Sequence, residues 1–86
     1  MAYRVIISRT VQKQLNGLPA GIQERIVKQL IILQDNPRPQ GRLKLAGHEN
    51  EYRVRVGDYR VRYEVIDRES IVVLLHCKHR KDVYRN

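Results

Sequence analysis

The chain has 86 residues, enough for one small domain with a modest hydrophobic core and too few for a second domain. Its 17 lysines and arginines outnumber nine acidic residues and give a formal net charge of +8, which favours nucleic acid, an anionic membrane surface or an acidic protein as the partner. No segment approaches the roughly 20 apolar residues of a membrane span, the N-terminus lacks the apolar core of a signal peptide, and the single cysteine excludes an internal disulfide, so we expect a soluble protein of the reducing cytoplasm.

A short β-branched run near the N-terminus predicts a strand from Tyr3 to Ile7. Ser8 then suits the N-cap of a helix, because its hydroxyl can accept a hydrogen bond from a free amide of the first turn. Asn16 and Gly17 are expected to end this helix. Its apolar residues recur at helical spacing, at Val11, Leu15 and Leu18.

Pro19 predicts the start of a second helix, since the missing proline N–H is not needed in a first turn. The Asn-Pro pair at positions 36–37 is expected to terminate it. The polar, proline- and glycine-rich stretch that follows contains Leu43 and Leu45, which we expect to anchor a loop or short strand against the core. The predicted buried stripe of the second helix consists of Ile22, Ile26, Leu30 and Leu33, widened by Val27 and Ile31.

The second half of the chain predicts three strands, at Glu51–Val56, Tyr59–Ile66 and Ile71–Lys78. The two-residue turn signal Gly57-Asp58 joins the first pair, and the last strand carries the apolar run IVVLL of a buried interior strand. Residues 1–86 therefore predict one α+β domain: an N-terminal strand, a two-helix hairpin and an antiparallel three-stranded meander, followed by a short basic tail. The helices should cover one face of a small, mostly antiparallel sheet. The pairing partner of the first strand is left open.

Arginine alternates with apolar residues on both arms of the predicted hairpin YRVRVGDYRVRY. The alternation places four arginines on the face away from the helices, and the turn pairs Arg55 with Arg60 and Arg53 with Arg62. Like charges directly across a ladder destabilise it. The plain structural interpretation is a solvated face whose arginines pair with carboxylates such as Glu51 and Glu64. Two stacked like-charge pairs favour instead a site for a polyanion.

The C-terminal segment HCKHRKDVYRN adds basic and aromatic side chains at the end of the last strand. Arginine matches phosphate oxygens and tyrosine can stack on a base, so this combination is typical of RNA binding. A metal site is not expected, because His76 and Cys77 are adjacent in a strand and would point to opposite faces. The residues expected to contact RNA are Lys44, Arg62, Lys78, Lys81 and Arg85.

Any catalysis by this chain is therefore expected to be metal-free and to need no cofactor. Metal-free RNA cleavage requires that the 2′-hydroxyl loses its proton, that the pentavalent phosphate is stabilised and that the leaving 5′-oxygen is neutralised. Prearranged cations meet the second requirement, which is usually the largest catalytic contribution.

The segment YRVRVGDYRVRYEV, followed by CKHRKDVYR and preceded by a strand and two helices, resembles the RelE toxin family of the RelE/ParE superfamily. The resemblance implies a ribosome-dependent mRNA endonuclease, or mRNA interferase, that is inhibited by a RelB-like antitoxin wrapped around it in a hetero-oligomer. It also implies that Arg53 holds substrate phosphates, Arg60 stabilises the transition state and Arg80 acts at the leaving 5′-oxygen. Tyr84 would stack on or orient the nucleotide.

The general base departs from the family pattern. Where family members have a lysine, this chain has Arg55, whose guanidinium pKa above about 12 makes it a poor proton acceptor. We therefore expect Arg55 to be an electrostatic clamp. Imidazole titrates near pH 6.5, so His79 is the first candidate for the base. His76 is the second, since the sequence leaves open which sheet face it occupies, and Tyr84 is the third.

Two other functions remain open at this stage. A ParE-like gyrase poison would share the fold but typically lacks the complete nuclease set, so the joint presence of Arg53, Arg60, Arg80 and Tyr84 favours the RelE branch. A non-catalytic nucleic-acid-binding module is equally consistent with the net charge, because phosphate neutralisation needs no chemistry. A membrane-surface protein is less supported, since no predicted helix sets a cationic face against a bulky apolar one.

Overall fold

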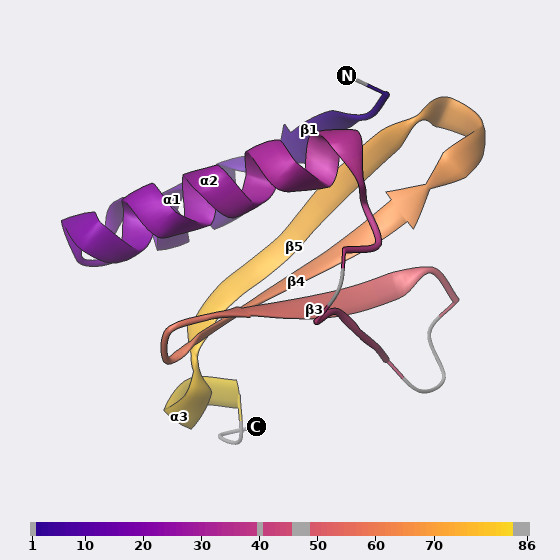
Figure 1. Ribbon diagram of the computed structural model, residues 1–86. Helices are drawn as coiled ribbons and strands as arrows, with labels where there is room; N and C mark the ends of the chain where they lie inside the picture. Colours follow the sequence, from indigo (N-terminus) through magenta and orange to yellow (C-terminus); the bar gives the residue numbers. More distant parts are fainter. Residues whose placement is uncertain (1, 40, 46–48, 84–86) are drawn as a thin grey trace.

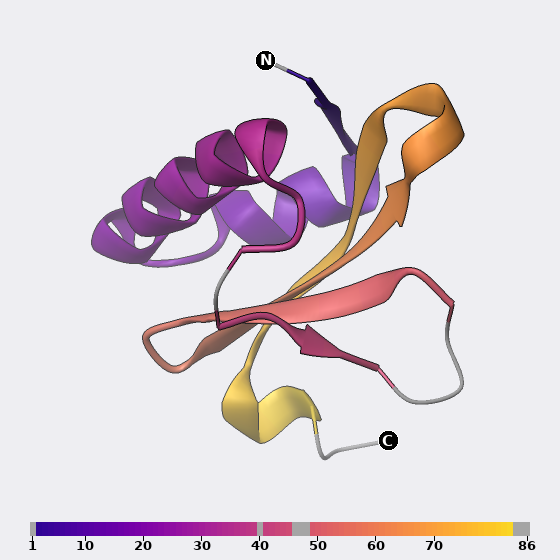
Figure 2. The same cartoon turned by 45° about the vertical axis from the view of Figure 1, so that its right-hand side comes forward.

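A computed structural model describes residues 2–39, 41–45 and 49–83 (Figure 1). The strands in this part of the chain form one five-stranded sheet in the order β1-β5-β4-β3-β2. Figures 1 and 2 show α1 and α2 side by side over one face, and α3 at the far end of β5, close to the β3–β4 turn. The expected α+β architecture is confirmed. The elements are β1 (Arg4–Ile7), α1 (Arg9–Asn16), α2 (Ala20–Asp35), β2 (Leu43–Lys44), β3 (Glu51–Val56), β4 (Tyr59–Ile66), the 3-10 turn η1 (Asp67–Glu69), β5 (Ile71–His79) and α3 (Arg80–Val83).

The partner of the first strand is β5. β1 runs parallel to it, with Arg4 opposite Ile71 and Ile7 opposite Leu74, whereas all other pairs in the sheet are antiparallel. β1 stops opposite Leu74, so no strand of the described residues pairs with the rest of β5 on that side. There the side chain of Gln14 in α1 substitutes for a strand and accepts the Cys77 amide at 3.0 Å.

Both helices begin and end at the predicted boundary residues, but Leu18, expected on the first helix, lies after its end. The Ser8 hydroxyl accepts the Val11 amide at 3.2 Å as the N-cap of α1, and Gly17 follows its last residue. α2 starts directly after Pro19 and ends before Asn36.

The predicted width of the α2 stripe is wrong. Ile26 is fully buried, but Val27 and Ile31 are 50% and 53% exposed. Each residue turns the helix by about 100°, so a side chain one position beyond Ile26 already points away from the sheet. The prediction for Leu43 is also wrong: it is half exposed in β2, opposite Arg53, rather than packed into the core.

The core lies between the two helices and the sheet, and the alternating burial of β3 and β4 defines it. Val54, Val56 and Val61 are buried on the helix side, and so is Tyr63. The Tyr63 hydroxyl donates to the Pro37 carbonyl at 2.8 Å, and burial raises its pKa to about 12. No helix in the described ranges is long and apolar enough to cross a membrane.

A polar network holds the C-terminal end of β4, the end away from the β3–β4 turn, to other parts of the fold. Arg38, just after α2, binds both oxygens of Asp67 at 2.8 and 3.1 Å, and its Nε donates to the Tyr52 hydroxyl at 2.9 Å. The Tyr3 hydroxyl also donates to Asp67, at 2.6 Å. The network joins four segments that are distant in sequence. None of its residues lies at the β3–β4 turn.

Candidate functional site

The β3–β4 hairpin pairs its arginines in the predicted register. Arg55 lies opposite Arg60, and Arg53 lies opposite Arg62. The valines between them are buried beneath the helices, so these four side chains project from the other side of the sheet, which we call the arginine face. Gly57 forms the turn with a positive φ of 59°, the conformation that tight hairpin turns require.

β5 adds two more basic groups to the arginine face. Lys78 lies opposite Arg60, and His76 lies opposite Arg62. In a regular strand His76 would share a face with the buried Leu74, but the β4–β5 register shifts between these positions, as a β-bulge does, and the alternation moves by one residue. The bulge therefore brings an imidazole beside the arginines.

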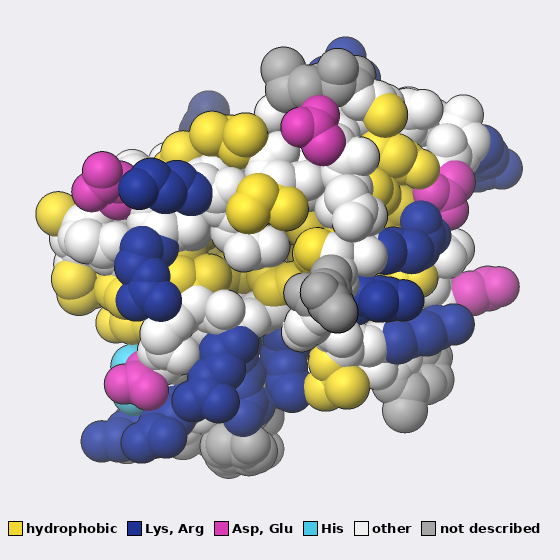
Figure 3. All heavy atoms as spheres, in the orientation of Figure 1, with side chains coloured by type: hydrophobic (Ala, Val, Ile, Leu, Met, Phe, Trp, Pro, Cys, Tyr) yellow, Lys and Arg dark blue, Asp and Glu magenta, His cyan; other side chains and the backbone are white. Residues whose placement is uncertain are grey.

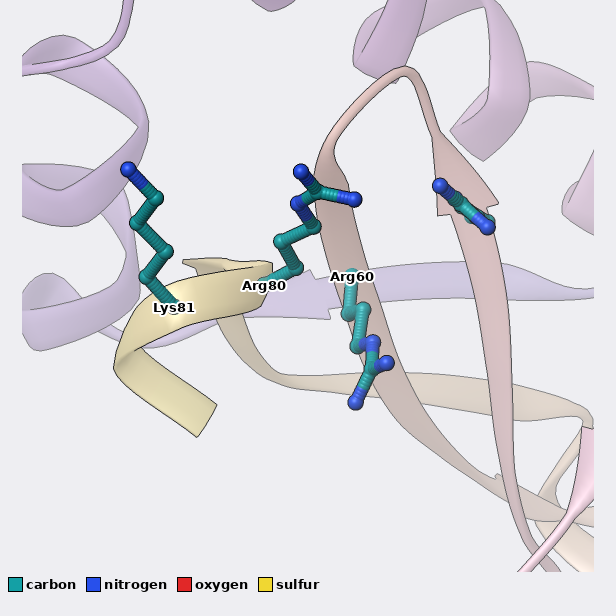
Figure 4. Close-up of a pocket in the computed structure, with 4 residues that line it drawn as sticks. Arg60, Arg80 and Lys81 are labelled. Atoms are coloured by element: carbon teal, nitrogen blue, oxygen red, sulfur yellow. The ribbon is translucent and has the colours of Figure 1, made fainter. Parts of the chain in front are cut away.

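Four cationic side chains surround an open cavity of about 320 Å³ where the hairpin meets α3. Figure 4 shows Arg80 and Lys81 rising from α3, with Arg60 extending from β4 in the opposite direction to Arg80. In Figure 3 the side chains of Lys and Arg gather over this end of the molecule. An open hollow with such a lining suits a phosphate or another anion. The lining residues are Arg55, Arg60, Arg80 and Lys81.

The hairpin turn holds α3 in place beside the cavity. The Arg80 amide donates to the Asp58 carbonyl at 2.8 Å, which fixes the first residue of α3 against the turn. The two side chains also form an ion pair at 3.9 Å, but both are more than half exposed, so solvent screens it. Asp58 was assigned only to the turn from the sequence, and its contact with Arg80 depends on the tertiary structure.

Arg62 follows the plain structural interpretation of the arginine face. Its Nε and Nη2 donate to one oxygen of Glu51 at 3.0 and 2.6 Å. Arg55 differs, since its Nε donates to the Gly57 carbonyl at 3.0 Å. The arginine face therefore has a carboxylate-bound half at Arg62 and a cationic half at the cavity.

The two histidine candidates lie on opposite sides of the sheet. His79 is opposite Tyr59, which packs edge-on against it with ring centroids 5.2 Å apart, and its Nδ1 accepts the Lys81 amide at 3.2 Å. This register sets His79 on the helix side, so its placement gives no support to a role as base. His76 occupies the arginine face and is half-buried. Desolvation, then Lys78 and Arg62, lower its pKa from the ordinary value.

Comparison with known proteins decides the family. Residues 5–84 match the family model described as ParE toxin of type II toxin-antitoxin system, parDE. This chain belongs to the RelE/ParE superfamily of toxins. Toxin RelE3 of Methanocaldococcus jannaschii is 34% identical to it over 94% of both chains, and toxin RelG of Mycobacterium tuberculosis is 34% identical over 99% of both. The chain also matches the archaeal RelE–RelB complex from Pyrococcus horikoshii OT3 with a TM-score of 0.81 and 35% identity, covering 93% of this chain and 97% of that one. The expected RelE membership is confirmed.

Several residues expected in the site of this RelE-family toxin lie away from the cavity. Lys44 in β2 is opposite Tyr52, which sets it on the helix side of the sheet. Arg53 is on the arginine face, two cross-strand pairs further from the turn than Arg55. Two other candidates, Tyr84 and Arg85, fall outside the described residues.

Cys77 is a core residue, as expected. It is 3% exposed, and burial raises its pKa to about 11, so the thiol is not activated as a nucleophile. His76, its neighbour, lies on the other sheet face. The two side chains therefore do not converge on a common metal position.

Proposed function

We propose that this RelE-family toxin is a ribosome-dependent endoribonuclease that cuts mRNA by attack of a 2′-hydroxyl on the adjacent phosphate. The observation that carries the proposal is that Arg55, Arg60 and Arg80 all line one open cavity. Bond breaking concentrates negative charge on the phosphorane oxygens, and prearranged donors interact more strongly with that charge than with the ground state. Removal of one such donor typically costs roughly 3 to 4 kcal/mol of transition-state stabilisation.

The proposed roles follow from charge and position. Arg60, at the cavity, stabilises the pentavalent phosphate, and Arg80 neutralises the leaving 5′-oxygen. Arg55 is an electrostatic clamp, because a guanidinium does not release its proton near neutral pH. Arg53, on the same face, holds a neighbouring phosphate. Tyr84 stacks on a base.

The surrounding basic residues extend the proposed RNA path. Lys78 and Lys81 flank the cavity, whereas Arg62 must exchange its contact with Glu51 for a phosphate before it can contribute. Arg85 belongs to the same basic tail. Lys44 lies on the helix side of the sheet, so it would contact the RNA only where the RNA chain passes round the edge of the sheet at β2.

We also propose that a RelB-like antitoxin masks this surface. Two observations support it: the similar RelE chain from Pyrococcus horikoshii OT3 was solved with RelB, and the net charge of +8 attracts acidic segments. The toxin would act in the cytoplasm, where translating ribosomes supply its substrate.

Reconstituted translation with end mapping of the message tests the proposal. We expect cleavage inside the translated region only when ribosomes are present, and a loss of about 10²- to 10³-fold in the cleavage rate for Arg60→Ala and for Arg80→Ala. Arg68→Ala is the matched control, because Arg68 is exposed in η1 at the opposite end of β4. Intact messages with wild-type protein, or full activity in both variants, would contradict it.

Because the chain matches a family model of ParE toxins, poisoning of DNA gyrase is a second candidate function. That function predicts DNA damage with intact messages after the protein is induced in cells. The same induction experiment therefore distinguishes the two: shortened messages support the ribonuclease, and damaged DNA supports the gyrase poison.

A further inference from the structure

His76 is a half-buried imidazole on the arginine face, two cross-strand pairs from the pair that borders the cavity. Its partner in β4 is Arg62, and the next pair on this face toward the cavity is Arg60 with Lys78. Residues two positions apart on a strand are separated by about 7 Å, so one nucleotide could reach both the imidazole and a cavity that held its phosphate. Its Nδ1 is buried without a hydrogen-bond partner among the residues that the structure describes.

We propose that His76 is the general base that takes the proton of the attacking 2′-hydroxyl, an inference that rests on the proposed ribonuclease function. The nitrogen proposed to accept the proton is Nε2, because Nδ1 is buried away from solvent. The site needs such a base because Arg55, which stands where the family has a lysine, carries a permanently protonated guanidinium.

Burial of His76, and then the cations around it, lower the pKa of the imidazole and so favour its neutral form. Arg62 faces it from β4 and Lys78 from β5, and both disfavour a second positive charge beside them. Two carboxylates lie further along this face, Glu64 in β4 and Glu51 opposite it in β3, and Glu51 binds Arg62. A neutral imidazole at pH 7 is the form that accepts a proton, and RNA phosphates bound to the cations would offset their charge as the imidazolium forms.

The proposed step balances without another reactant. The 2′-oxygen forms a bond to phosphorus as its proton moves to His76, and the bond from phosphorus to the 5′-oxygen breaks. The products are a 2′,3′-cyclic phosphate and a 5′-hydroxyl, whose proton comes from water while Arg80 offsets the developing charge. His76 then returns its proton to solvent.

Single-turnover cleavage on programmed ribosomes between pH 5.5 and 8 tests this role. For the wild type we expect the rate to fall at acid pH, below the ordinary histidine pKa, and to be level above it. His76→Gln should be about 10²- to 10⁴-fold slower and should lose this acid limb. Free imidazole should restore part of the rate of His76→Ala, which a variant damaged only in its fold would not show.

His79→Gln is the matched comparison, because it removes an imidazole three residues away on the other sheet face and should retain the acid limb. The inference is overturned if His76→Gln keeps the wild-type rate and pH profile, or if the acid limb is lost in His79→Gln instead. In either case the wild type still cuts mRNA and the proposed function stands. A wild type that cuts nothing would remove the proposed function together with this inference.

Discussion

Arg55 and Arg60 are direct cross-strand partners, and both line the cavity that Arg80 and Lys81 complete. Facing cations destabilise an antiparallel ladder, by an amount comparable to the roughly 0.2–1 kcal/mol that a favourable pair contributes. A polyanion bound between them removes this repulsion. The arrangement therefore links the stability of the fold to occupancy of the site.

We predict that inorganic polyphosphate raises the thermal midpoint of the wild type more than that of Arg55→Gln. At 100 times its Kd, a ligand that binds only the folded state adds about 2.7 kcal/mol of stability. Differential scanning fluorimetry at low and high salt measures the shift, which should shrink as salt increases. Arg68→Gln should respond like the wild type. Equal shifts in all three proteins would mean that the anion binds elsewhere.

The Arg38–Asp67 pair predicts a dependence of stability on acid pH. Arg38, and then the Tyr3 hydroxyl, lower the pKa of Asp67 to about 2, against about 3.9 for an unperturbed aspartate. The folded pKa is the lower one, so the stabilisation is complete above about pH 4 and is lost as pH falls toward 2. Urea denaturation should therefore show a steeper loss between pH 4 and pH 2 for the wild type than for Asp67→Asn. Glu69→Gln, a neighbouring exposed carboxylate in η1, should retain the steep loss.

Two glycine substitutions should have opposite effects on stability. Gly57→Ala should lower the free energy of unfolding by about 1–2 kcal/mol, because an L-residue there must adopt φ near +59° and its Cβ would lie 3.2 Å from Arg25 Nη1. Gly21→Ala should raise it by up to about 1 kcal/mol, since Gly21 lies in α2 with open space around the added carbon. Chemical denaturation measures both. If Gly57→Ala left the free energy of unfolding unchanged, the hairpin turn would have to accommodate the alanine without strain, contrary to this prediction.

Gln14 should protect the Cys77 amide from hydrogen exchange, because no described strand pairs with this part of β5 on the β1 side. We expect Gln14→Ala to lower the free energy of unfolding by about 0.5–1.5 kcal/mol and to speed hydrogen exchange at that amide. Gln12→Ala is the matched control, because the Gln12 side chain bonds only to exposed Asn16 within α1. Unchanged exchange at Cys77 in Gln14→Ala would contradict the assigned contact.

The sequence by itself determined the two long helices, β1 and the three strands of the meander, but it predicted α3 only as a basic tail and β2 only as a loop or short strand. Ser8, Pro19 and the Gly57-Asp58 turn mark boundaries through local backbone chemistry, and the alternation in β3 and β4 gives the arginine register. These features depend on residues close together in the chain, so a pattern of period two or 3.6 records them.

Only the tertiary structure decided which distant groups meet. β1 pairs with β5 and packs its half-buried Val5 and Ile7 against the core, and the Arg38–Asp67 bond joins residues 29 positions apart. The bulge in β5 moves His76 to the arginine face, and the Asp58 carbonyl brings Arg80 to the hairpin. Local residue propensities favour no particular strand partner, sheet face or long-range contact for these residues. Packing and hydrogen bonding across the whole domain select one arrangement.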